Sequence, residues 1–174
     1  MKDIRLSDAP LSFKVLVSFF LLAVAIGYVF GLIHIYSDVG FSYTGIVTHY
    51  RGSPKELTTP PEFAFARLVH VHHVHIFGIS LLFFLVGILF TLTQLPETAK
   101  AIFVAIPFIG MFLDFSSFWL LVFVSPVFAF FGMAFGALMA LSFFLIVGRP
   151  LYEMWALPLW HHLWREEKVP WFLK

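Results

Sequence analysis

The sequence predicts an all-α protein: an integral membrane four-helix bundle with both termini cytoplasmic and a C-terminal interfacial helix. Two observations predict this fold class. Of the 174 residues, 60% are hydrophobic and only 12% are charged, which is more apolar surface than a water-soluble domain of this size can bury. Four stretches of the chain also reach the roughly 20 apolar residues that a helix needs to cross a bilayer.

The composition excludes several classes of protein. Cys is absent, basic clusters are missing and the formal net charge is only +1. A disulfide scaffold, a haem attached covalently through Cys and a nucleic-acid-binding protein are therefore excluded. Any metal or cofactor has to be held by His, Met or oxygen ligands, so the eight His residues are the ones to follow.

The expected spans cover about residues 11–36, 67–94, 99–123 and 126–147, within a transmembrane domain of residues 1–150. Short links make the last three spans antiparallel neighbours. The longer link at residues 37–66 carries several Gly and Pro residues, and we expect it to form an ordered cap on the outer face. Residues 151–174 mix Trp with Glu and His, which is typical of a helix in the cytoplasmic headgroup layer.

The distribution of positive charge predicts the orientation. Of the 11 Lys and Arg residues, only Arg51, Lys55 and Arg67 lie on one side of the expected spans. Cytoplasmic loops are enriched in Lys and Arg, so both termini are expected in the cytoplasm of a bacterial inner (plasma) membrane protein. The cap then faces the periplasm.

Most of the His residues are expected at this outer end, together with the single clear carboxylate inside the spans, Asp114. An intramembrane carboxylate costs at least about 2.5 kcal/mol to insert and is functional by default. We expect Asp114 to have a catalytic role, by orienting a ligating His, binding a metal or exchanging a proton during quinol chemistry. A structural hydrogen bond is the alternative. The candidate metal ligands are His34, His49, His70, His72, His73, His75 and Asp114.

Helical spacing divides the four His residues that open the second span into two pairs, with His72 and His75 on one face and His70 and His73 on the opposite face. Only one of these two pairs can face the interior of the bundle. Two His residues three positions apart can chelate one metal ion, but they cannot bind a haem from opposite sides. A haem with two His ligands therefore also needs a His from another helix, and His34 is the obvious candidate.

Gly27 and Gly31 form a Gly-xxx-Gly face one turn below His34. Beside a His at the same depth, backbone without side chains leaves room for a planar macrocycle. Close helix-to-helix packing is the more common meaning of this spacing.

Four short helices with His near one membrane face resemble the cytochrome b subunits that anchor respiratory enzymes, including those of the formate dehydrogenase gamma type. The segment His49-Tyr50-Arg51-Gly52, followed by the run His-Val-His-His-Val-His, is also similar to a group of small bacterial membrane proteins. The first resemblance implies a haem b and electron transfer within a respiratory complex.

Three functions stay open. The first is a haem b-binding electron-transfer subunit that exchanges electrons between quinone and a periplasmic partner such as a cytochrome c. The second is a non-haem copper, iron or zinc site in the His and Asp cluster. The third is a cofactor-free membrane anchor or assembly subunit whose His cluster binds a partner or senses pH. In each case the chain contacts membrane lipid and works with other subunits. The expected haem-binding residues are His34, His72, His75, Gly27 and Gly31.

Overall fold

The computed structural model describes residues 6–52 and 61–158, and all regular structure in these ranges is helical. The long helices are α1 (Leu11–Val39), α3 (Pro61–Thr91), α4 (Glu97–Phe123) and α5 (Phe128–Leu151), and the short α2 (Tyr43–Arg51) follows α1. Two single turns, η1 (Leu6–Asp8) and the π-helical η2 (Tyr152–Ala156), flank them. Four helices are long and apolar enough to cross a membrane. The expected all-α membrane protein is confirmed.

The spans lie where the sequence predicts them, but their ends differ. α1 continues to Val39 and α3 begins as early as Pro61, so the link between them is shorter than the predicted 37–66. α3 ends at Thr91 rather than near 94, and α5 begins at Phe128. Where α1 extends past its predicted end, the polar residues Ser37 and Asp38 continue the helix, which a hydrophobicity pattern does not register.

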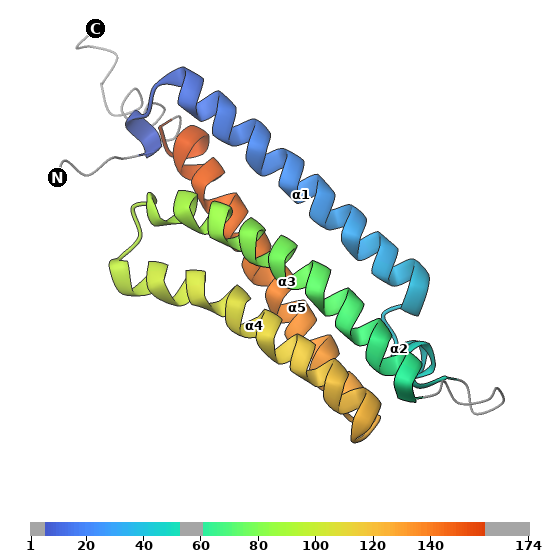
Figure 1. The fold of residues 1–174 in the computed structure, drawn as a ribbon. Coiled ribbons are helices and arrows are strands. Elements are labelled where there is room, and N and C mark those ends of the chain that lie inside the picture. Colours follow the sequence, from blue (N-terminus) through green and yellow to red (C-terminus); the bar gives the residue numbers. More distant parts are fainter. Residues whose placement is uncertain (1–5, 53–60, 159–174) are drawn as a thin grey trace, which may run out of the picture.

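The link after α1 contains an ordered helix, as expected for the cap. Gly40 ends α1 with a φ of 70°, and its N–H donates to the Tyr36 carbonyl at 2.8 Å. Ser42 begins α2, and its hydroxyl accepts a hydrogen bond from the Gly45 N–H at 3.0 Å. A Cβ at Gly45 would lie 1.9 Å from the Val39 carbonyl oxygen, so only glycine fits this turn. The turn lays α2 across one end of the bundle, called the cap end below (Figure 1).

The inner face of α2 packs on the ends of α4 and α5. Ile46 is buried in one cluster with Leu121 and Ala129. The ring of Tyr50 lies 4.7 Å from that of Phe118, measured between centroids. These contacts fix α2 over the cap ends of α4 and α5.

α1 lies along one side of the bundle and α4 along the other, with α3 and α5 between them (Figure 1). In α1 only Val17 and Leu21 are buried, and both belong to the main core cluster together with residues such as Phe83 of α3. Tyr28 adds a contact nearer the cap end, because its ring stacks on Phe143 of α5 at 4.2 Å. Most of the α1 surface is therefore left to lipid or to another membrane helix.

The C-terminal boundary differs from the predicted one. The sequence predicts that the span ends at Val147 and that a separate interfacial helix follows residue 150. In the structure α5 continues to Leu151, and the candidate span runs on through η2 to Ala156. Residues 159–174, which include His161 and His162, lie outside the described residues.

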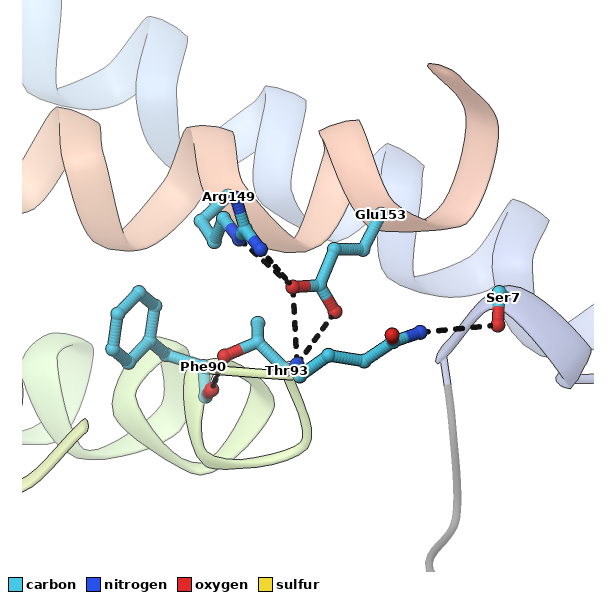
Figure 2. Close-up of polar contacts among 6 residues, drawn as sticks. Ser7, Phe90, Thr93, Arg149 and Glu153 are labelled. Carbon is cyan, nitrogen blue, oxygen red and sulfur yellow. Dashed lines mark hydrogen bonds and ion pairs between the residues drawn. The ribbon is translucent and has the colours of Figure 1, made fainter. Parts of the chain in front are cut away.

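Contacts with the neighbouring elements explain why the helix continues. Glu153 in η2 is fully buried and accepts hydrogen bonds from Arg149 Nε at 2.8 Å and from Arg149 Nη2 at 2.7 Å (Figure 2). Its two carboxylate oxygens also lie 3.0 and 2.9 Å from the Gln94 N–H, in the link between α3 and α4. The Trp155 indole N–H donates to the Ser18 hydroxyl of α1 at 2.8 Å. These contacts hold the segment against the bundle through its buried Glu153 and Met154, while Tyr152 and Trp155 stay exposed.

Candidate functional site

The predicted site residues all lie in the cap-end half of the helices or in α2, but they do not converge on one pocket. The structure divides them among the side of α1, the contact between α2 and α3, the contact between α3 and α4, and the contact between α4 and α5. Each part has its own partners.

His34 lies on the exposed side of α1. Its Nε2 atom is 3.7 Å from Asp38 Oδ2, one turn further along, and the two side chains are 76% and 47% exposed. One and two turns before His34, a Cβ at Gly31 or Gly27 would meet nothing within 4 Å. The helix backbone at these two glycines is therefore exposed, and no side chain of the described residues packs on it.

His49 joins α2 to α3 through Arg67. The guanidinium of Arg67 donates to the His49 carbonyl oxygen at 3.2 Å, contacts His49 Nε2, and lies 5.8 Å from the centre of the Tyr50 ring. Burial, followed by the positive charge of Arg67, lowers the pKa of His49, although Asp38 opposes the shift. A neutral His49 ring can accept a hydrogen bond from Arg67, so this contact serves to hold the cap.

Of the four His residues in α3, only His72 is buried. Its Nδ1–H donates to the Leu68 carbonyl at 2.6 Å, and its ring lies edge-on to Phe115 of α4 at 4.5 Å. His75 donates in the same way to the Val71 carbonyl at 2.8 Å, but its side chain is exposed. The pair formed by His72 and His75 is therefore split between the interior and the surface.

The other predicted pair of α3 is exposed. His70 and His73 both face away from the bundle, and the ring of His73 lies 5.5 Å from that of Phe77 on the same helix. A helix that turns His72 toward α4 has to turn these two residues outward, as the helical spacing predicts.

Asp114 lies at the contact between α4 and α5, as the only buried acid in the cap-end half of the described spans. The residue is 8% exposed, and its Oδ1 atom is 3.5 Å from where a Cβ of Gly136 would stand. The carboxyl group thus packs against the backbone of α5 at Gly136. None of the ion pairs in residues 6–52 and 64–158 includes Asp114.

Within the described residues, no three His, Asp or Glu side chains lie close enough to hold a metal ion. His34 and His72, the expected haem ligands, have different neighbours and face different surroundings. The described surface has two open depressions, one at the Arg149 end of α5 and one beside α2 that includes His49, and neither is lined by His72 or Asp114. The residues present therefore do not fit a haem or a three-ligand metal held by the described part of this chain alone.

The polar contact of Arg149 with Glu153 was not predicted from the sequence. The two residues are four positions apart and oppositely charged, a spacing that favours pairing on a helix. The surrounding Trp residues masked this signal, because they indicated an interfacial segment. The contact of Tyr28 with Phe143 was not predicted either, because it depends on how α1 packs against α5.

A family model described as a transmembrane helical domain matches residues 40–159, which is more than half of the chain. The chain belongs to the Aq_1264_TM family. Neither the curated proteins nor the solved structures contain a match. The Aq_1264_TM match begins directly after α1 ends at Val39 and spans α2 to α5 and η2. The least covered helix thus lies outside the part that the family model describes.

Proposed function

We propose that the chain is a membrane subunit of a larger assembly, and that the side of α1 carrying Gly27 and Gly31 receives a helix of a partner subunit. The supporting observation is a contrast between two Gly-xxx-Gly faces. On α5, a Cβ at Gly132 would lie 3.6 Å from Phe118 and one at Gly136 would lie 3.5 Å from Asp114, so α4 covers this face. On α1 the described chain places nothing within 4 Å of either glycine.

Small residues promote helix association in membranes because they let two backbones approach closely. A Gly-xxx-Gly face open to lipid gains nothing from the missing side chains, since lipid tails contact a leucine equally well. The face is useful only when a second helix covers it. We place this assembly in a bacterial inner membrane with both termini cytoplasmic, on the basis of the Lys and Arg distribution.

The test is the substitution Gly31→Leu, read out by crosslinking in native membranes and by the size of the complex in mild detergent. The side chain enters open space within the chain, so the variant is expected to fold as the wild type does while its crosslinked partner is lost. The matched control is Gly148→Leu on α5, which also meets nothing within 4 Å but belongs to no Gly-xxx-Gly pair in α5. A Gly31→Leu variant that stays fully assembled would contradict the proposal.

A haem b-binding electron-transfer subunit is the second candidate function. One observation favours it: the ring of His34 is largely exposed one turn beyond the open glycines, and so remains accessible to a group shared with a partner. Absorption spectra of the oxidised and reduced protein, with metal analysis of the same sample, test this candidate. Sharp reduced bands that disappear in His34→Ala would support haem. Copper, iron or zinc without such bands would support the non-haem site.

A further inference from the structure

Two carboxyl groups are buried in the described membrane spans, and their surroundings differ. Glu153 is fully buried and has the guanidinium of Arg149 at 2.7 Å and the Gln94 N–H at 2.9 Å. Asp114 is 92% buried, since only 8% of it is exposed, and it has neither an ion-pair partner nor a hydrogen bond in the described part of the chain. Glu153 therefore has a positively charged partner, and Asp114 has none in the described part of the chain.

The helices around Asp114 supply no positive charge to it. α5 presents Gly136, and the first basic residue along that helix is Arg149, about 20 Å further at the helical rise of 1.5 Å per residue. α3 directs His72 at Phe115 and Trp119, on a different face of α4. In the described parts of α1 and α2, no residue forms an ion pair with Asp114 either.

We propose that Asp114 is a proton-binding site: its carboxyl group is neutral in the resting protein, and it gains and loses one proton from the cap end. An ionised carboxylate without a cation pays a desolvation cost in a membrane span that a neutral carboxylic acid largely avoids. Within the described residues, Asp114 belongs to no group of His, Asp and Glu side chains that could hold a metal ion. The proposal is independent of the docking function of α1.

Two features suit Asp114 for exchange rather than for permanent burial. The carboxyl oxygen lies beside the bare backbone of Gly136, at the contact distance of a Cβ. Within the described residues the carboxyl oxygens have no hydrogen-bond partner and keep some accessible surface, and Tyr50 of the cap packs on Phe118, one turn beyond Asp114. The ligand of this site is therefore a proton, delivered or removed at the end where α2 lies.

Dicyclohexylcarbodiimide tests the proposal, because this apolar reagent adds to a protonated carboxyl group in apolar surroundings and does not react with an ionised one. The purified full chain in detergent micelles is treated at a series of pH values, and the modified peptides are identified by mass spectrometry. We expect modification at Asp114, with a rate that falls about tenfold per pH unit above the midpoint of titration. Glu153 is the internal control and is expected to stay unmodified, because Arg149 keeps it ionised.

A second measurement covers the case in which the reagent does not reach the site. If Asp114 is neutral, Asp114→Asn replaces one neutral group by another of the same shape and leaves the unfolding midpoint close to that of the wild type. Glu153→Gln is the matched variant and is expected to lower the midpoint clearly. The proposal is overturned if Asp114 is modified at a rate that does not depend on pH. It is also overturned if Asp114→Asn destabilises as much as Glu153→Gln, whether or not the reagent reaches the site.

Discussion

The ion pair of Arg149 with Glu153 allows a quantitative prediction. Arg149→Gln leaves a carboxylate that is fully buried and retains only the Gln94 N–H as a partner. Removing one member of a buried ion pair costs about 3–5 kcal/mol, because the other charge stays behind without compensation. Glu153→Gln leaves a cation whose side chain is 34% exposed and can be solvated, and the new amide still offers an oxygen to Gln94. Its cost is expected to be lower, about 1.5–3 kcal/mol, the value of a hydrogen bond to a charged group.

The assay is reversible unfolding in mixed micelles, followed by tryptophan fluorescence, for both single variants and the double variant. The single substitutions are expected to be non-additive, because the double variant leaves no buried charge unpaired. Lys100→Gln serves as the control, since its partner Glu97 is 86% exposed and pairs of this kind contribute at most about 1 kcal/mol. Equal costs for Arg149→Gln and Glu153→Gln would refute the reasoning, because the argument rests on the unequal burial of the two side chains.

Two further predictions concern the cap. Gly45→Ala forces a Cβ against the Val39 carbonyl oxygen and is expected to cost about 1–3 kcal/mol, whereas Gly27→Ala enters open space and leaves thermal unfolding of the purified chain unchanged. Burial and Arg67 lower the pKa of His49 in the folded protein. As the pH falls, the unfolded chain therefore binds a proton at His49 at a higher pH than the folded chain does. The stabilisation from the contact of His49 with Arg67 is therefore complete above about pH 6.5 and is lost as the pH falls through the folded-state pKa. Unfolding midpoints measured against pH should fall more steeply for the wild type than for His49→Gln, and parallel curves would exclude this role.

The sequence predicts the fold well because span length and apolar composition depend on local residues alone. The ends of the helices are less predictable. Residues 151–158 carry Glu153 and Trp155, which read as an interfacial segment when their partners are unknown. Only the contacts with Arg149, Gln94 and Ser18 explain why the helix continues past Pro150.

The sequence predicts how far along each span the candidate site residues lie, but not which way their side chains point. Counting residues along a span places His72 and Asp114 in the cap-end half, which the structure bears out. The rotation of each helix about its axis depends on the partners that cover it, so the sequence could not choose between the two His pairs of α3. Of the four His residues of α3, the structure buries His72 alone, with its ring against Phe115 and Trp119 of α4.

The docking face of α1 and the carboxyl group of Asp114 are connected through α5. The ring of Tyr28, which follows Gly27 directly, stacks on Phe143 of α5, and Gly136 of the same helix lies beside Asp114. A partner helix seated on Gly27 and Gly31 would restrict α1 at this level and so bias the environment of the acid. Coupling between two sites is reciprocal, so a change in the protonation of Asp114 has to alter partner affinity by the same factor. If both proposals hold, crosslinking through α1 therefore depends on pH in the wild type and loses that dependence in Asp114→Asn. An unchanged pH dependence in that variant would show that the two sites act separately.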